Sequence, residues 1–441
     1  MGNARFLWIR NGHLTDPASG LDGAFDLRLD TETGLVDRVV PAGQEPDAEG
    51  DTLDAAGLTV APGLVDVHVH FRDPGFTHKE DIITGAAAAA RGGFTSVIMM
   101  ANTKPPIDNT DVLSYVLEKG AETGIRAYAC GNVTKGMAGR ELTDFEALIG
   151  GGAVGLTDDG LPIMDEGLVT DAMKRAAALQ VPISFHEEDP AYVQNPGYNH
   201  GEASAHYGFY GADRMAEISM TERDIRLAGG TGARIDIQHI SAAESVELVR
   251  KGKAAGIDVH AEATPHHFSL TEEAAIRYGT LAKMNPPLRT ERDRLAIIEG
   301  LRDGTIDMIA TDHAPHSTEE KNAGLTKAPS GIIGLETSLA LGITELVNRG
   351  YLTMSQLMER MSAGPAAVYR LPAGRLSVGD PADLVLFDPA ETFTVRREDF
   401  ASKAENSPFV GRELRGRVHL TICGGKIIYS TENAKERMIS R

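Results

Sequence analysis

The sequence of 441 residues predicts an α/β fold, a (β/α)₈ barrel of the TIM type with a small β-sandwich domain built from both chain termini. Three observations predict it. Apolar runs alternate with helix-forming segments through the middle of the chain, and strand-like segments with polar turns fill the first part and the last part. A doubly wound open sheet is the structural alternative for the middle of the chain.

Composition excludes several classes of function. The chain has 63 Asp and Glu against 43 Lys and Arg, a net charge of −20. Such a surface repels phosphate backbones and anionic lipids, so we expect no nucleic-acid partner and no membrane partner. The two cysteines, Cys130 and Cys423, are too few for a disulfide scaffold or a cysteine-held metal cluster. With no signal-peptide pattern and no long apolar run, we expect a cytoplasmic protein.

The two ends of the chain predict one composite β-domain. Residues 6–9 precede Asn11 and Gly12, and alternating residues 25–29 precede a turn at 31–34, which are hairpin patterns. Near the other end, strand-like segments 382–387, 418–422 and 426–429 flank Gly424 and Gly425. Because chain ends often lie close together, we expect residues 1–61 and 373–441 to form a single small domain.

The middle of the chain, residues 62–372, predicts the barrel. Its candidate strands are apolar on both faces, as in a parallel sheet covered by helices. They are residues 64–69, 94–100, 125–130, 153–157, 181–185, 234–238, 257–263 and 306–311. Helix-forming residues lie between several of them, as in 84–91, 171–179 and 291–302. The formal GxGxxG match at 150–155 precedes a strand, so we interpret it as a loop and not a dinucleotide site.

Histidines and carboxylates gather at the ends of these strands. His68 and His70 end the first strand, and residues two apart on a strand point to the same side. Other candidates follow later strands: Asp158, Asp159, His186, His239 and Asp312. The carboxyl ends of barrel strands converge on one face, where active sites lie. Imidazole and carboxylate without thiolate suit Zn²⁺ or a similar divalent metal, with enough ligands for two ions. For His266 and His267, packing or loop contacts are the preferred interpretation, and His313 is left out because it faces the opposite way from Asp312 if the strand continues.

Five motifs resemble those of the type I dihydroorotases in the amidohydrolase superfamily. They are residues 66–75 (DVHVHFRDPG), 101–103 (ANT), 157–160 (TDDG), 285–289 (NPPLR) and 310–316 (ATDHAPH). The resemblance implies a barrel that holds zinc, one or two ions and in the favoured interpretation two. His68 and His70 would bind one ion beside Asp312, and His186 and His239 would bind the other. Asp159 would bridge them, chosen over Asp158 for its 27-residue spacing to His186.

The resemblance also implies a substrate site and a reaction. The implied substrate contacts are His70, Phe71, Arg72, Asn102, Asn285, His316, Ser330 and Gly331. The implied reaction is the reversible hydrolysis of L-dihydroorotate to N-carbamoyl-L-aspartate in pyrimidine biosynthesis. A metal-activated hydroxide would attack the cyclic amide, with Asp312 as the general acid/base. Ala101, where proline is common, and Ser330, in a slot that is often aromatic, depart from the family pattern.

Two alternatives to this function remain. A hydantoinase or allantoinase would use the same barrel, but those enzymes generally bridge their metals through a carboxylated lysine on the fourth strand. Residues 151–160 contain no lysine. The second alternative is a non-catalytic partner of aspartate carbamoyltransferase, although all six ligand positions here hold competent residues. An active enzyme can also bind that partner, and we expect a homo-oligomer, in the simplest case a dimer.

Overall fold

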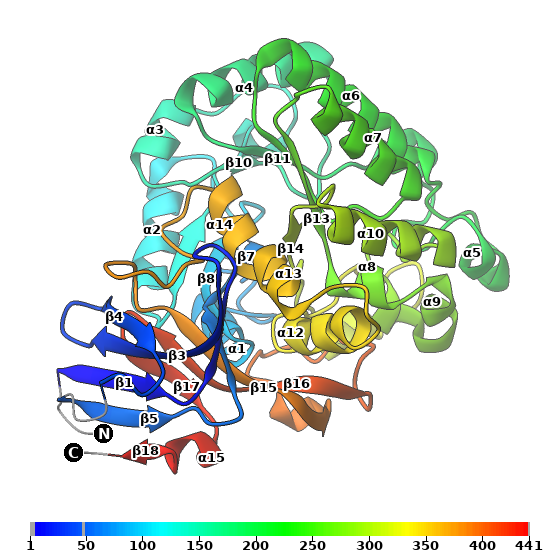
Figure 1. Cartoon of the computed structure of the whole chain (residues 1–441). Helices are drawn as coiled ribbons and strands as arrows, with labels where there is room; N and C mark the ends of the chain where they lie inside the picture. The colour runs from blue at the N-terminus through cyan, green and yellow to red at the C-terminus, as the bar shows by residue number, and fades with distance from the viewer. Residues whose placement is uncertain (1–4, 46–48, 440–441) are drawn as a thin grey trace.

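The computed structural model describes residues 5–45 and 49–439, so residues 1–4, 46–48 and 440–441 of the predicted β-domain lie outside the described ranges. Eight strands at its centre run parallel and follow one another around a barrel (Figure 1). They are β7 (Leu64–Val69), β8 (Phe94–Met99), β9 (Arg126–Ala129), β10 (Leu156–Thr157), β11 (Ile183–Phe185), β12 (Ile235–Ile237), β13 (Val259–Ala263) and β14 (Met308–Ile309).

Two bridges close the barrel. Strands β7 to β9 form one sheet and β10 to β14 another, each in chain order. Gly131 pairs with Leu156 to join β9 to β10, and Val69 pairs with His313 to join β7 to the end of β14. The order is therefore circular, which confirms the barrel and rules out the open doubly wound sheet.

Helices connect the strands and cover the outside of the barrel (Figure 1). Those of ten or more residues are α1 (Ile82–Arg91), α2 (Thr110–Ala121), α4 (Glu166–Leu179), α6 (Met215–Thr231), α7 (Ala243–Ala254) and α10 (Glu291–Asp303). Shorter ones are α3 (Phe145–Gly150), α5 (Glu202–Tyr207), α8 (Pro265–Ser269), α9 (Glu272–Tyr278), α11 (Thr318–Lys321), α12 (Ser338–Leu341), α13 (Met354–Met358) and α14 (Gly364–Val368). In the described ranges, none of the helices combines the length and apolar character needed to cross a lipid bilayer.

Capping residues set where the predicted helices begin. The apolar pattern places one helix at 84–91, but α1 starts at Ile82 because Asp81 accepts the amide N–H of Thr84 and caps the end. Likewise α4 starts at Glu166, before the predicted residue 171, because Asp165 accepts the N–H of Leu168.

Ten strands from both chain ends form one further sheet. The N-terminal ones are β1 (Phe6–Arg10), β2 (His13–Asp16), β3 (Leu21–Asp30), β4 (Leu35–Pro41), β5 (Asp51–Asp54) and β6 (Thr59–Pro62). The C-terminal ones are β15 (Leu384–Thr394), β16 (Glu413–Cys423), β17 (Lys426–Ser430) and β18 (Met438–Ile439), with α15 (Glu432–Lys435) before the last. Strand β15 pairs with β6 and β18 with β5, which confirms a β-rich unit built from both ends. Its division from the barrel at residues 62 and 372 stays a prediction.

One of the two predicted N-terminal hairpins is wrong. Strands β3 and β4 pair across the turn at 31–34 as expected. However, β1 and β2 do not pair with each other, because both lie along β3, end to end. Asn11, with φ of 63°, turns the chain between them without reversing it. Gly424 and Gly425 do form a hairpin turn, and their φ values of 55° and 72° suit a type I′ turn.

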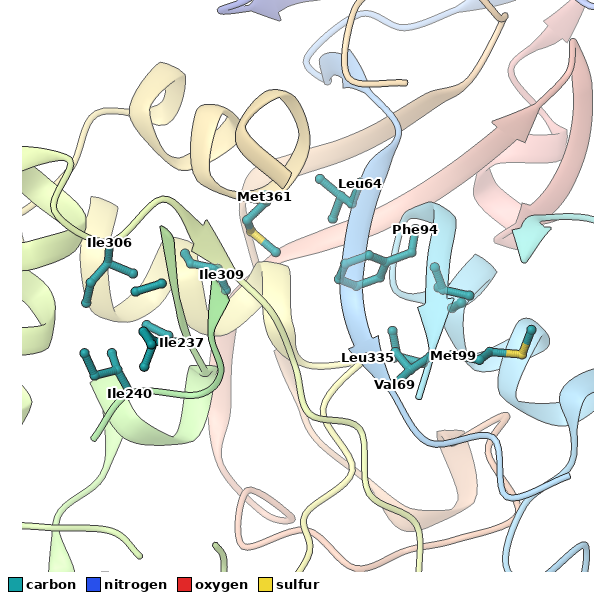
Figure 2. Close-up of a cluster of buried hydrophobic side chains, with 14 of the residues drawn as sticks. Leu64, Val69, Phe94, Met99, Ile237, Ile240, Ile306, Ile309, Leu335 and Met361 are labelled. Carbon is teal, nitrogen blue, oxygen red and sulfur yellow. The ribbon is translucent and has the colours of Figure 1, made fainter. Parts of the chain in front are cut away.

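The largest hydrophobic core lies between the barrel strands and their covering elements. Figure 2 shows part of it, including Leu64 and Val69 of β7, Phe94 and Met99 of β8, and Ile309 of β14. These side chains are 0–3% exposed. A rigid packed layer of this kind fixes the strand ends, and with them the side chains that follow each strand.

Candidate active site

A cavity of about 210 Å³ lies at the carboxyl ends of the barrel strands. Almost all of the side chains that line it are polar. The lining residues are His70, Arg72, Asn102, Asp159, Gly160, His186, His239, Met284, Asn285, Asp312, Ala314, His316 and Ser330. The structure therefore brings together groups from strand ends that are up to about 240 residues apart in the sequence.

Asp159 lies at the centre of four imidazoles. Its carboxylate oxygens are 3.5 Å from His68 Nε2, 3.4 Å from His70 Nε2, 3.7 Å from His186 Nδ1 and 3.8 Å from His239 Nε2. All five side chains are buried. A carboxylate in this position can contact two ions at once.

Asp312 also lies beside His68 and His70. Its Oδ1 is 2.9 Å from His70 Nε2 and 3.6 Å from His68 Nε2. Asp312 and His239 have φ values of 45° and 33°, which are uncommon for residues other than glycine and occur at functional sites. The left-handed turn at each strand end directs the side chain to the cavity.

His186 and His239 face each other. His186 Nδ1 is 2.9 Å from His239 Nε2, and the rings form an edge-to-face pair. On its other side, His186 Nε2 lies 3.6 Å from Glu188 Oε2, and Glu188 accepts a hydrogen bond from Asn285 Nδ2 at 3.3 Å. Glu188, which sequence reasoning did not select, thus links the histidine cluster to the remainder of the cavity.

Asp158 points away from this cluster. Its carboxylate accepts hydrogen bonds from the backbone N–H groups of Val133 and Thr134, the Thr134 hydroxyl and Asn132 Nδ2. It therefore stabilises the segment that follows β9. Of the two neighbouring acids, the structure places Asp159 among the histidines.

Glu262 is a buried acid that sequence reasoning missed. It lies in β13, and its Oε2 is 2.9 Å from His68 Nδ1. Because a carboxylate only accepts, His68 Nδ1 carries the proton and Nε2 is left as a metal ligand. The same Oε2 accepts the backbone N–H of His239 at 3.3 Å. A single charged residue inside an apolar strand was the available signal.

Asn102 plays a similar role for His70. Its Oδ1 is 3.0 Å from His70 Nδ1, and its Nδ2 donates to Asp159 Oδ2 at 3.0 Å. The side-chain amide therefore fixes the orientation of an imidazole and a carboxylate at once, and it also lines the cavity.

The electrostatics of the cluster favour a bound cation. Burial alone would lower the pKa of His68, but the charges of Glu262, Asp159 and Asp312 raise it well above its usual value. Burial would raise the pKa of Asp159, but the charges of His68 and His70 and the nearby His239 imidazole hold it well below its usual value. The carboxylates attract any cation that can enter, and a metal ion binds in competition with protons.

The donor set suits a metal ion. Two groups of side chains place three possible ligand atoms within 4.8 Å of one another: His68 with His70 and Asp312, and His68 with Asp159 and His239. His68 Nε2 is buried and has no hydrogen-bond partner. An orphaned imidazole nitrogen among carboxylates is what a divalent ion would satisfy.

Cations and hydrogen-bonding groups line the opposite side of the cavity. Arg72, with φ of 61°, donates from Nε to the Pro315 carbonyl at 3.3 Å, and its Nη2 lies 3.4 Å from His316 Nε2. The Ser330 hydroxyl donates to Asn285 Oδ1 at 3.2 Å. The predicted contacts Arg72, Asn285, His316 and Ser330 are therefore together.

Phe71 and Gly331 lie outside the cavity lining. The Phe71 ring is 3% exposed and packs edge-on to His313. The Gly331 N–H donates to the Lys283 carbonyl at 2.9 Å, and its own carbonyl accepts from Lys321 and Asn406. Strand alternation turns Phe71 away from the side that His70 occupies. Contact of these two residues with the substrate stays a prediction.

Of the other strand-end histidines, His267 and His313 have structural partners, whereas His266 Nε2 is buried without a hydrogen-bond partner among the described residues. His267 is buried, with Nε2 3.0 Å from the Pro286 carbonyl and Nδ1 2.8 Å from the Thr264 hydroxyl. His313 Nδ1 accepts the N–H of Gly334 at 3.2 Å. The contacts of His267 agree with the packing interpretation.

Comparison with known proteins gives one family. The profile of the amidohydrolase family matches residues 59–428. A protein named dihydroorotase from Clostridioides difficile (strain 630) is 54% identical over 424 residues, covering 96% of this chain and 99% of the relative. A dihydroorotase from Lactococcus lactis subsp. lactis (strain IL1403) is 50% identical, covering 97% of this chain and 100% of the relative.

Solved structures show the same architecture. An L-hydantoinase (dihydropyrimidinase) from Arthrobacter aurescens superposes with a TM-score of 0.87 at 26% identity, covering 96% of each chain. A dihydropyrimidinase from Brevibacillus agri NCHU1002 gives a TM-score of 0.82 at 22% identity, covering 96% of this chain and 95% of the other. The second likeness is to the fold alone.

Proposed function

Since the chain belongs to the amidohydrolase family, a family of metal-dependent hydrolases, we propose that it is a dihydroorotase. The proposed reaction is the reversible conversion of L-dihydroorotate to N-carbamoyl-L-aspartate, a step of pyrimidine biosynthesis. The observation that carries the proposal is Asp159 lying within 3.8 Å of four buried imidazoles, beside a cavity that also holds Arg72. Relatives of this name match nearly the whole chain at about half identity.

We propose Zn²⁺ as the metal and two ions as the number. His68 and His70 would hold one ion with Asp312, His186 and His239 would hold the other, and Asp159 would bridge. Nitrogen and oxygen ligands without thiolate support this choice. When bound, the metal supplies Lewis acidity to the ring carbonyl and lowers the pKa of a water molecule.

The cation-lined side of the cavity would orient the substrate. The Arg72 guanidinium can grip both oxygens of the substrate carboxylate, assisted by Asn102 and His316. Asn285 and Ser330 can donate to and accept from the ring. With the carboxylate held there, the ring amide points toward Asp159 and Asp312.

Asp312 would move the proton. Water adds to the ring carbonyl carbon, the bond from that carbon to the ring nitrogen breaks, and the nitrogen leaves as part of the carbamoyl group. The Asp312 carboxylate accepts the proton from water and returns it to the nitrogen. His70 Nε2 lies 2.9 Å from Asp312 Oδ1, so the same ion could contact both side chains and hold the carboxylate in place.

The alternatives have less support. The solved relative named hydantoinase shares the fold. Enzymes of that group generally bridge their metals through a lysine on the fourth strand, but residues 156–159, which are β10 and the two acids after it, include no lysine. A purely structural partner of aspartate carbamoyltransferase would not need all six ligand positions filled. We also propose that the enzyme is a cytoplasmic dimer that can bind this transferase. The mass of the protein in solution, alone and with the transferase, would test both interactions.

The test is direct. Purified protein is given dihydroorotate, with hydantoin and allantoin as control substrates, and ring opening is followed by the loss of amide absorbance. We expect turnover of dihydroorotate and at least about a hundredfold lower kcat/KM for the controls. Turnover of the controls alone would contradict the proposal.

A further inference from the structure

Two buried lysines lie behind one side of the cavity. This side, which we call the Ser330 wall, consists of His316 and Ser330, and the backbone of residues 329 and 331 supports it from behind. Lys321, at the end of α11, and Lys283, just before Asn285, are each 2% exposed. Lysines are rarely buried this completely, so their contacts need an explanation.

Both ammonium groups donate to backbone carbonyls of the loop that forms the wall. Lys321 Nζ donates to the carbonyls of Pro329 and Gly331, each at 3.0 Å. Lys283 Nζ donates to those of Leu325 at 2.9 Å and Ala328 at 2.7 Å. The two lysines thereby hold residues 325–331 in one conformation, on both sides of Ser330.

Neither lysine has an acidic partner. In the described ranges, no carboxylate lies within 4.0 Å of Lys283 Nζ or Lys321 Nζ, and the same holds for the Arg72 guanidinium. By contrast, Lys79, also near His316, pairs with Glu320 at 2.9 Å. In a chain with a net charge of −20, three unpaired cations on one side of a small cavity are unexpected.

Burying the two ammonium groups without an acidic partner costs free energy of desolvation. Burial, together with the like charge of Lys283, lowers the pKa of Lys321 to about 7, and burial lowers the pKa of Lys283 too. Backbone carbonyls offset only part of the cost of removing an ammonium group from water. A bound anion would offset the remainder and favour the protonated form of both lysines.

The charge of Lys321 reaches a group that lines the cavity. His316 Nε2 is 2.8 Å from the Ser330 carbonyl, next to the two carbonyls that Lys321 holds. Burial and the charges of Arg72, Lys79 and Lys321 lower the pKa of His316, so this imidazole stays neutral. The charges of Arg72 and Lys321 therefore act on the wall together, while Glu320, 3.5 Å from His316 Nδ1, is paired with Lys79.

We propose that Lys283 and Lys321 are positioning residues that also determine specificity: they hold the Ser330 wall in place and make it selective for a ligand that bears a carboxylate. The inference rests on the proposed function, which supplies such a ligand. If the two lysines only stabilised the loop, the wall would accept any ring of the right shape. Because they are charged, they favour a ring that bears a carboxylate.

The experiment compares an anionic with a neutral ring. Wild type, Lys321→Met, Lys283→Met and the control Lys327→Met are assayed with dihydroorotate, and dihydrouracil, the same ring without the carboxylate, is the competitive inhibitor. Lys327 is exposed on the same loop, so its variant loses the same charge outside the wall. Bound metal and the melting temperature are measured for each protein.

For Lys321→Met we expect KM for dihydroorotate to rise about tenfold, with kcat within about threefold and dihydrouracil inhibition unchanged. Lys327→Met should match wild type. An unchanged KM, or an equal loss for both ligands, would overturn the inference. If Lys321→Met does not fold, Lys283→Met decides by the same comparison. A wild type that does not turn over dihydroorotate would overturn the proposed function, and this control arm separates the two failures.

Discussion

The two sides of the cavity balance their charges in different ways. On the metal side, which comprises His68, His70, Asp159, His186, His239 and Asp312, side chains contact one another across the barrel. On the Ser330 wall, cations instead contact backbone carbonyls of a single loop. One side has carboxylates in need of a cation, and the other has cations in need of an anion.

This difference suggests how a small anion would be oriented. The carboxylate of the substrate would bind at the wall, and the bond to be hydrolysed would then lie over the metal side. Changes on the metal side should therefore affect turnover and metal content, whereas changes on the wall should affect KM. The predictions below test that division.

Metal removal should have the largest effect. We expect the purified protein to carry a divalent metal, and chelation to abolish activity, because the carbonyl and the water then lose their activation. Metal analysis and an assay before and after chelation measure this. Re-addition of Zn²⁺ is the control, and activity in a metal-free sample would refute the metal side as the catalytic centre.

The substitution Asp312→Asn should have the second-largest effect. We expect it to keep its metal on the histidines and to lose turnover by about a thousandfold, since the amide cannot accept and return the proton. Steady-state kinetics and metal analysis measure the two quantities separately. Near-normal kcat would contradict the role proposed for Asp312.

Arg72→Met tests how the side of the cavity next to the Ser330 wall binds the substrate carboxylate. We expect KM for dihydroorotate to rise about a hundredfold with a smaller change in kcat, because the carboxylate loses a two-pronged partner. Arg72→Lys is the matched control and should recover part of the loss, as it keeps the charge without the fork. A fall in kcat alone, with KM unchanged, would place Arg72 on the metal side.

Glu262→Gln should weaken the metal side without touching the substrate. We expect metal affinity to fall about ten- to a hundredfold, because the carboxylate no longer fixes the proton on His68 Nδ1. Competition with a metal indicator measures it. Asp307→Asn, which removes an acid before β14 that pairs with Lys253 at 2.7 Å, is the control and should keep its metal. If both variants lost metal equally, general destabilisation of the fold would explain the loss, and the role proposed for Glu262 would be wrong.

Asp158→Asn should have the smallest effect on chemistry. We expect activity within about threefold of wild type and a stability loss of about 1–2 kcal/mol, because the acid supports the N–H groups after β9. Asp159→Asn, its neighbour, should lose metal. Kinetics and denaturant unfolding of the pair measure this contrast, and the reverse result would exchange the two roles.

Sequence reasoning identified most of the site because the signal is local. His68, His70, His186, His239 and Asp312 each end an apolar segment, and strand alternation and barrel geometry then predict where they gather. The same reasoning missed Glu262, Glu188, Lys283 and Lys321. No local pattern marks these four residues, because most of their partners are distant in the sequence or belong to the backbone. Phe71 and Gly331, which the resemblance implied as substrate contacts, lie outside the cavity lining, and their contact with the substrate stays a prediction.

The sequence by itself determined the barrel, the β-rich unit from both chain ends and the residue type at each strand end. These follow from hydrophobic periodicity and from the spacing of motifs, which depend only on residues that are close in the sequence. Tertiary structure decided that Asp159 and not Asp158 faces the histidines, and that Glu262 orients an imidazole 194 residues away. It also decided that two lysines lie unpaired behind the wall. Closure of the barrel sets those contacts, because it joins strand ends that no local pattern connects.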